Sequence, residues 1–379
     1  MRLNLFYDEA NEDLQYRISF LGNRLYAART MVPQGFEGFF QQSARYTSVH
    51  TSTAIEGNTL DYDAAMVVLV EGADEDQPLE VEKVNLDEAY ELMASLVEDK
   101  TTKIDQGIIR TMNSIVLKGL PDAKARNRGK FRVGPSLIVS ASTGEVRYRP
   151  PPPQWVPDLM NNFVDDLNRW MRECPGPVAA ALAHFGLISI HPFDDGNGRT
   201  ARLVADMILN LTGFAADGMI AISQVFHDRL TEYYDTLRES QGEEFKEEVD
   251  ATPFVRFHTD ALVGAAIMLE EHAIRFHKQQ DQFARRFDGV LNQRQIMGLM
   301  FMTSLGPVST SHYARLTKSS QATALSDLNM LVQKQLVARE GAGRNTRYRV
   351  YPGVLNVAES SLSREGVPKQ GQDFKPAPN

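Results

Sequence analysis

The stretch HPFDDGNGRTAR, residues 191–202, decides how the middle of this 379-residue chain folds. Residues 178–190, just before it, are apolar on nearly every side, which is typical of a helix buried at the centre of a domain. Pro192 prevents that helix from continuing, and Leu203 and Met207 recur at the spacing of a second helix. We therefore expect a short loop between two core helices.

The residues of this loop predict an anion site with catalytic groups beside it. Gly196-Asn197-Gly198 can turn successive backbone N–H groups into one concavity, and the N-terminus of the following helix favours an anion. Arg199 and Arg202 project from one side of the first helical turn and suit a polyphosphate better than a single carboxylate. Asp195 adds an oxygen ligand for Mg²⁺ bridging phosphates, and His191 is a candidate general base. These parts predict nucleotidyl or phosphoryl transfer to a hydroxyl.

The composition is that of an ordinary globular protein. Hydrophobic residues make up 42% and charged residues 23%, and the length predicts roughly two or three domains. The net charge of −9 argues against a nucleic-acid coat protein, and the one cysteine, Cys174, cannot form an internal disulfide. The N-terminus lacks the features of a signal peptide, and no uninterrupted apolar stretch reaches about 18 residues. We expect a cytoplasmic protein with no membrane partner.

Residues 131–149 break the helical pattern of their surroundings. Leu137-Ile138-Val139 and Val146-Arg147-Tyr148 are β-rich runs, and a segment that ends in Gly144 separates them, which predicts a hairpin. Prolines at 150–153 stop any strand. From residue 156 to residue 171, apolar side chains recur at intervals of three and four, which predicts an amphipathic helix.

These features together resemble the Fic family. Its signature, His-x-Phe-x-(Asp/Glu)-Gly-Asn-Gly-Arg-x-x-Arg, is matched at every defined position of residues 191–202. Gly129-Lys130-Phe131-Arg132 resembles the family's Gly-x-Phe-Arg segment, and the 136–148 hairpin resembles its target-docking flap. The resemblance covers roughly residues 1–245 and implies a mainly α fold, with a Fic-type helical core and a β-hairpin flap.

The resemblance also implies a reaction, the transfer of AMP from ATP to a Ser, Thr or Tyr hydroxyl of a protein. That protein is an unidentified substrate or the chain itself. His191 would deprotonate the acceptor hydroxyl, and Asp195 would hold Mg²⁺ on the α- and β-phosphates. The amides around Gly196 to Gly198, with Asn197, would bind the phosphates, while Arg199 would support the β-phosphate and Arg202 the γ-phosphate.

Two further groups of residues have roles that the resemblance implies. Tyr233 and Tyr234 resemble residues that line the family's adenine pocket, although two aromatic residues near a helix are equally consistent with core packing. The flap would align the target segment by strand addition, and its expected contact residues are Leu137, Ile138, Val139 and Val146.

A second motif predicts autoinhibition. Ser52-Thr53-Ala54-Ile55-Glu56-Gly57 resembles the family's inhibitory motif, (Ser/Thr)-x-x-x-Glu-(Gly/Asn). A carboxylate presented to Arg202 would form a charge-assisted pair and occupy the place of the γ-phosphate. We therefore expect Ser52, Glu56 and Gly57 to restrain the enzyme. In some family members the same glutamate supports removal of AMP, and the sequence leaves this alternative open.

Residues 291–351 predict a separate unit of three helices followed by a hairpin. Residues 319–328 resemble a winged-helix recognition helix, and residues 341–350 resemble the wing. This winged helix-turn-helix (α+β) domain would bind DNA or another protein. Basic side chains greatly outnumber Asp327 and Glu340 here: they are Arg294, Arg315, Lys318, Lys334, Arg339, Arg344, Arg347 and Arg349.

We thus expect five regions. They are an N-terminal helical region with the inhibitory helix (1–110), a Fic catalytic core (111–245), a helical connector (246–290), the winged-helix domain (291–351) and a disordered tail (352–379). Two alternatives to protein adenylylation stay open. One is a DNA-binding transcriptional regulator whose Fic domain senses nucleotide or modifies the chain itself. The other is a Fic enzyme with a different donor, and a homodimer is compatible with each function.

Overall fold

The computed structural model describes residues 1–121, 127–139, 144–343 and 346–355. The chain divides into two compact units, Met1–Lys278 and Gln279–Asn379. The division falls within one long helix, α12 (Thr252–Arg286), inside the region expected to connect the catalytic core with the C-terminal domain.

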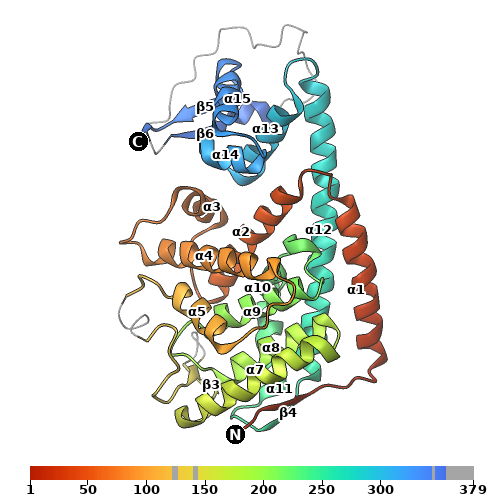
Figure 1. The fold of residues 1–379 in the computed structure, drawn as a ribbon, viewed down its shortest axis with the longest axis vertical. Helices are drawn as coiled ribbons and strands as arrows, with labels where there is room; N and C mark the ends of the chain where they lie inside the picture. The colour runs from red at the N-terminus through yellow and green to blue at the C-terminus, as the bar shows by residue number, and fades with distance from the viewer. Residues whose placement is uncertain (122–126, 140–143, 344–345, 356–379) are drawn as a thin grey trace. The chain divides into compact units, whose positions relative to one another are not determined.

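The first unit is mainly helical, as the sequence predicts (Figure 1). Before α12 its helices are α1 (Glu12–Met31), α2 (Glu37–Ile55), α3 (Tyr62–Glu71), α4 (Pro78–Glu98), α5 (Gln106–Val116), α7 (Val156–Glu173), α8 (Gly176–Ile190), α9 (Asn197–Leu211), α10 (Ile222–Asp228) and α11 (Leu230–Gln241). Short 3₁₀ turns lie at Pro153–Trp155 and Ala216–Gly218.

Helix α8 forms the centre of this unit, and the prediction of a buried helix is confirmed. Each of its residues from Gly176 to Ile190 is buried. It packs along α7 and α9, and the ring of Phe185 lies 5.5 Å from that of Phe254 in α12. A helix that is apolar on every side is stable only when neighbours cover all of its faces, so α8 fixes the positions of the helices around it.

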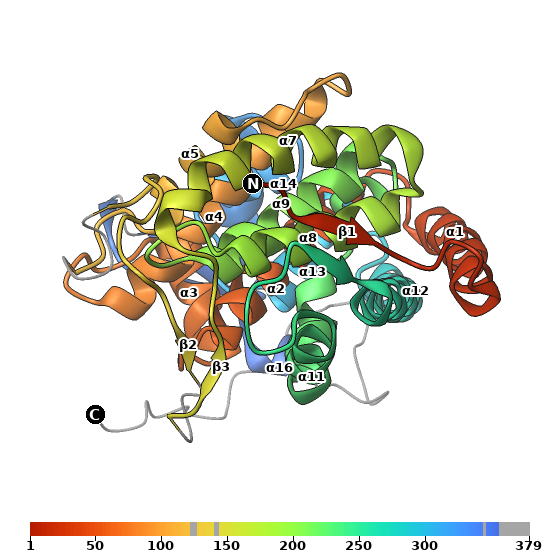
Figure 2. The same ribbon diagram turned by 90° about the horizontal axis from the view of Figure 1, so that it is seen from below.

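Two small sheets complete the first unit. β1 (Asn4–Phe6) pairs in parallel with β4 (Glu248–Asp250), so the prediction that residues 1–110 are helical is wrong at the start of the chain. β2 (Ile138–Val139) pairs antiparallel with β3 (Val146–Tyr148), which confirms the predicted hairpin. Figure 2 shows the β2–β3 hairpin projecting from the helices. Residues 140–143, part of the predicted turn, lie outside the described residues.

The second unit has the predicted order of elements. Its helices are α13 (Gln293–Leu305), α14 (Thr310–Leu316) and α15 (Gln321–Gln333), followed by the antiparallel strands β5 (Val337–Glu340) and β6 (Arg347–Val350). The winged-helix assignment itself stays a prediction. The short helix α16 (Pro352–Leu355) begins where a disordered tail was expected, and residues 356–379 lie outside the described part of the chain.

No helix in the described ranges is both long enough and apolar enough to cross a membrane.

Replacing a helical glycine by alanine normally stabilises a protein, but the close contact between α7 and α8 predicts the opposite at Gly186. A Cβ built on Gly186 would lie 2.7 Å from Cε2 of Phe163, whereas one on Gly264 of α12 would meet Val225 at an ordinary 3.5 Å. We expect Gly186→Ala to destabilise the first unit by about 1–3 kcal/mol through overpacking. Gly264→Ala should be neutral or stabilise it by up to about 1 kcal/mol.

Urea unfolding followed by tryptophan fluorescence measures both variants. The two tryptophans of the chain, Trp155 and Trp170, lie in the first unit and report on it alone. Equal stabilities of Gly186→Ala and Gly264→Ala would contradict the packing of α7 on α8 described above.

Candidate functional site

The loop between α8 and α9 begins at His191, whose backbone adopts the left-handed conformation (φ 49°, ψ 59°). A residue with a Cβ rarely takes this conformation, and hydrogen bonds hold it here. The His191 N–H donates to the Leu187 carbonyl at 2.9 Å, and the His191 carbonyl accepts from Arg132 Nε at 2.7 Å. The imidazole is therefore attached to a fixed point at the end of the central helix.

Arg132 braces this loop from a segment far away in the sequence. The residue is 2% exposed, and its guanidinium also donates to the carbonyls of Gly134 at 3.1 Å and Pro151 at 2.6 Å. Its backbone N–H donates to the Pro192 carbonyl at 2.9 Å. The resemblance to the Gly-x-Phe-Arg segment singled out Arg132, but its bracing role depends on contacts that no sequence pattern contains.

Asparagine side chains shape the glycine-rich turn. The Asn197 side chain accepts from the Phe193 N–H and donates to the Phe193 carbonyl, both at 2.9 Å. The side-chain amide of Asn197 is thus used within the loop, and only its backbone N–H is left to bind a phosphate. Asn113 of α5, which sequence patterns did not single out, donates to the Asp195 carbonyl at 2.9 Å. Gly196, at φ 76°, supplies the left-handed turn before α9.

Arg202 is 1% exposed, and two of its three nitrogen atoms bond the expected inhibitory motif. Its Nε donates to the Ser52 hydroxyl at 2.8 Å, and its Nη2 donates to the Ser52 carbonyl at 2.9 Å and to Glu56 Oε1 at 2.7 Å. The structure therefore brings together three residues that the sequence placed in two separate motifs.

Glu56 reaches the loop because of how α2 ends. The helix stops at Ile55, Glu56 is its C-cap residue, and Gly57 follows at φ 94°, a conformation that favours glycine. A Cβ built on Gly198 would overlap Glu56 Oε1, so the carboxylate lies directly over the glycine turn. Burial alone would raise the pKa of Glu56, but the nearby Arg202, followed by Arg199, holds that pKa below its ordinary value.

Arg199 is also buried, at 2% exposure, but it is held less closely. Its Nη2 lies 3.5 Å from Asp195 Oδ1, and its Nη1 lies 3.5 Å from Glu82 Oε1. Glu82, in α4, was not predicted as a site residue. The loop arginines thus each face a carboxylate from the N-terminal helices.

His191 lies next to these charges in its neutral form. Burial lowers the pKa of the imidazole to about 4, against the opposing effect of a hydrogen bond to the Ile188 backbone. Near neutral pH the ring is therefore able to accept a proton. A bound polyphosphate would bring negative charge close to the ring and raise its pKa toward neutrality.

The donor set for a metal at this site is a single carboxylate. No cluster of three or more His, Cys, Asp or Glu side chains placed to hold a metal ion occurs in the described part of the chain. Asp195 is 28% exposed at the edge of the loop, and its Oδ1 accepts from the Gly196 N–H at 2.6 Å. One carboxylate next to an anion site fits Mg²⁺ that substrate phosphates help to bind.

The two tyrosines expected near adenine have different positions. Tyr233 is 1% exposed, and its hydroxyl lies 3.0 Å from His184 Nε2 within a cluster of aromatic rings. It is therefore a core residue beneath the site. Tyr234 is 36% exposed and donates to the Ile55 carbonyl at 3.3 Å, so of the two tyrosines it presents the accessible ring.

The predicted flap residues lie on the β2–β3 hairpin with apolar side chains in solvent. Leu137, Val139 and Val146 are 52%, 51% and 38% exposed, and Ile138 is half-buried. Tyr148, at the base of the hairpin, is buried and donates to the Ser189 carbonyl of α8 at 2.9 Å. The hairpin is thus anchored to the central helix while its apolar side chains face outward.

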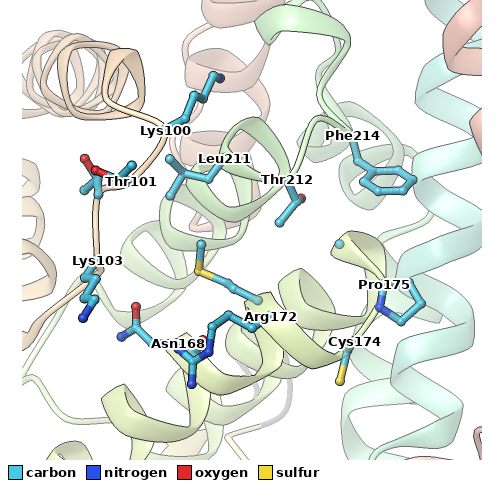
Figure 3. Close-up of a pocket in the computed structure, with 13 residues that line it drawn as sticks. Lys100, Thr101, Lys103, Asn168, Arg172, Cys174, Pro175, Leu211, Thr212 and Phe214 are labelled. Carbon is cyan, nitrogen blue, oxygen red and sulfur yellow. Dashed lines mark hydrogen bonds between the residues drawn. The ribbon is translucent and has the colours of Figure 1, made fainter.

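A cavity of about 550 Å³ lies at the other ends of α8 and α9. Figure 3 shows its lining side chains, which come from the segment after α4, the end of α7 and the end of α9. A 15-residue helix separates these ends from the 191–202 loop, on the order of 20 Å. None of the predicted site residues lines this cavity.

Residues 103–209 match the family model of the Fic/DOC family, and the chain therefore contains a Fic domain. It is 33% identical over 220 residues to "Protein adenylyltransferase Fic" of Nematostella vectensis, covering 57% of this chain and 46% of that protein. It is 30% identical over 171 residues to "Protein adenylyltransferase fic-1" of Caenorhabditis elegans, covering 44% and 32%. The chain thus spans less than half the length of these relatives.

Solved structures share the fold. A Fic family protein from Desulfovibrio desulfuricans G20 superposes with a TM-score of 0.53 over 92% of this chain and 97% of that one. A Fic domain-containing signalling protein from Bacteroides thetaiotaomicron gives a TM-score of 0.56 over 68% and 96%. Each is 22% identical to this chain, so the likeness concerns the fold alone.

The low pKa of His191 predicts how stability changes in acid. The unfolded imidazole takes up its proton as the pH falls through about 6.5, whereas the folded one takes it up only near pH 4. The native state therefore loses stability over this window as the pH falls. Asparagine tolerates the left-handed conformation, so His191→Asn is a suitable variant. Between pH 7 and pH 5.5 we expect its free energy of unfolding to fall by about 1 kcal/mol less than that of the unsubstituted protein.

Urea unfolding at several pH values, read from the same two tryptophans, measures this difference. A constant difference in unfolding free energy between the variant and the unsubstituted protein over pH 5.5 to 7 would contradict a half-buried, neutral imidazole at position 191.

Proposed function

We propose that this protein transfers AMP from ATP to a hydroxyl group of a protein and that Glu56 restrains the transfer. One observation carries the proposal: a neutral imidazole and two buried arginines meet at the glycine turn before α9. The names of the relatives support this reaction class. ATP and a protein acceptor are the expected substrates.

The reaction follows from the positions of these groups. Neutral His191 takes the proton of the acceptor hydroxyl, and the oxygen attacks the α-phosphorus of ATP. The bond to the β-phosphate breaks, so AMP becomes esterified to the acceptor and pyrophosphate leaves. The N-terminus of α9, with Arg199 and Arg202, stabilises the charge that develops on the leaving group.

Asp195 would hold Mg²⁺ together with the phosphates, since its carboxylate lies beside the glycine turn. The ion would neutralise phosphate charge when bound. This chain's own residues hold the other groups in place: Arg132 fixes the backbone of His191, and Asn113 fixes that of Asp195. A site held this firmly orients the acceptor and the phosphates before reaction.

The flap gives the protein acceptor a place to dock. The exposed apolar side chains of Leu137, Val139 and Val146 lie on a hairpin fixed to α8 by Tyr148. An extended segment of another protein, or of this chain, would pair along this hairpin through its backbone. The hairpin therefore selects a target segment by its extended backbone more than by the side chains of that segment.

The contact between Glu56 and Arg202 supports autoinhibition. Arg202 cannot bind a γ-phosphate oxygen with the donors that already bind Ser52 and Glu56. A carboxylate over Gly198 also repels a phosphate at the same position. The resting protein would therefore bind ATP in an unproductive position.

Substitution of Glu56 tests the proposal. We expect Glu56→Gly to raise AMP incorporation by about tenfold or more, because a charge-assisted hydrogen bond that blocks Arg202 is removed. Mass spectrometry of the variant incubated with ATP, Mg²⁺ and lysate detects AMP on the acceptor or on the chain itself.

Two controls accompany this measurement. His191→Ala in the Glu56→Gly background should abolish the product, and Glu98→Gly, the same substitution at the exposed end of α4, should not raise it. An increase that persists without His191 would exclude its role as the base. No AMP on any hydroxyl with the Glu56→Gly variant would contradict the transferase.

The second unit supports DNA binding less than it supports docking of another protein. Two of its basic residues are engaged in ion pairs: Arg294 binds Asp327 at 2.6 Å, and Arg349 lies 3.3 Å from Glu340. Exposed positions on α15, the expected recognition helix, include Leu325. We propose that residues 291–351 dock a protein rather than read DNA, and a gel-shift screen with genomic DNA, with and without ATP, tests this.

A further inference from the structure

Glu82 of α4 lies beside the loop arginine that Glu56 does not bond. Its Oε1 is 3.5 Å from Arg199 Nη1, and the two side chains are 12% and 2% exposed. Screening by solvent is weak at such a site, so a charge pair of this length still contributes an attractive energy. Glu82 therefore supplies negative charge next to the guanidinium expected to hold a phosphate.

The donors of Arg199 are not all used. Its Nε and Nη1 make no hydrogen bond with any residue that the structure describes, and its contact with Asp195 Oδ1 is long, at 3.5 Å. A buried guanidinium has five N–H donors that favour close acceptors. Glu82 thus balances the charge of Arg199 but leaves some of its N–H donors without hydrogen bonds. These donors can bind the oxygens of a phosphate.

The second oxygen of Glu82 connects it to the inhibitory segment. Glu82 Oε2 accepts from Asn58 Nδ2 at 3.0 Å, and Asn58 follows Glu56 by two residues. The next residue of α4, Lys83, is buried and donates to the Thr53 hydroxyl at 2.7 Å. Two consecutive residues of α4 therefore hold the end of α2 from which Glu56 projects.

We propose that Glu82 is a second inhibitory carboxylate, which competes with a nucleotide phosphate for Arg199 while Glu56 competes for Arg202. This inference rests on the proposed function, because it assigns both arginines to phosphates. A nucleotide must then displace Glu56 from Arg202 and compete with the charge of Glu82 beside Arg199 before it binds both arginines. The α4 carboxylate also holds Asn58, so the two restraints are joined in one network.

A different role for Glu82 predicts the opposite result. If Glu82 only positioned Arg199 for the phosphate, its removal would weaken nucleotide binding. If it competes with the phosphate, its removal strengthens binding. The sign of the change therefore separates the two roles without any measurement of catalysis.

Calorimetric titration of the full chain with ATP, ADP and AMP tests the proposal. We expect Glu82→Gln to lower the dissociation constants of ATP and ADP by about fivefold. AMP, which has no β-phosphate, should bind as before. Glu56→Gly should strengthen ATP binding only, because Glu56 bonds Arg202 and not Arg199.

Glu88→Gln is the matched control. Glu88 lies on the same helix and pairs with Lys118 in a surface ion pair at 2.7 Å, so its substitution should leave all three dissociation constants unchanged. If Glu82→Gln does not fold, Glu82→Asp, which draws the carboxylate back from Arg199, gives the same comparison.

Unchanged or weaker ADP binding by a folded Glu82 variant would overturn the proposal. That outcome is distinct from failure of the proposed function. Stronger ADP binding without any AMP transfer by Glu56→Gly would leave the role of Glu82 in place and remove the transferase. AMP transfer by Glu56→Gly, together with unaltered ADP binding by the Glu82 variant, would support the transferase and exclude the role of Glu82.

Discussion

A guanidinium removed from water needs an anion beside it, and this requirement at Arg202 organises the site. The side chain is 1% exposed, and its partners here are Ser52 and the carboxylate of Glu56. Loss of that carboxylate without replacement would leave a buried charge unpaired, at a cost of several kcal/mol. Under the proposed function, a polyphosphate would supply a replacement. The resting and nucleotide-bound forms would then be two solutions to one electrostatic requirement.

The parts around this requirement differ in how firmly they are held. The loop that carries His191 is attached to the fully buried helix α8 and is braced by Arg132 and Asn113. Glu56 is the C-cap residue of α2, one residue past its end, and is followed by a glycine at φ 94°. Helix ends open more readily than core helices. The fold thus places a carboxylate from a helix end over a loop that side chains of distant segments hold in place.

The sequence predicts the elements whose patterns are local. α7, α8 and α9 follow from apolar spacing and from Pro192, and the contact of Glu56 with Arg202 follows from two motifs. The bonds from Arg202 to Ser52 were not predicted. The β1–β4 pair was missed because it joins three-residue strands some 244 positions apart. The bracing by Asn113, the approach of Glu82 and the burial of Tyr233 also arise from packing between distant segments.

The central claim is that Arg202 exchanges Glu56 for the terminal phosphate of ATP. A crystal structure of the Glu56→Gly variant with Mg²⁺ and a non-hydrolysable ATP analogue tests it most directly. The account predicts a γ-phosphate oxygen within hydrogen-bonding distance of the Arg202 guanidinium, with the β-phosphate beside Arg199. A γ-phosphate bound away from Arg202, with that guanidinium still engaged only by α2, would contradict it.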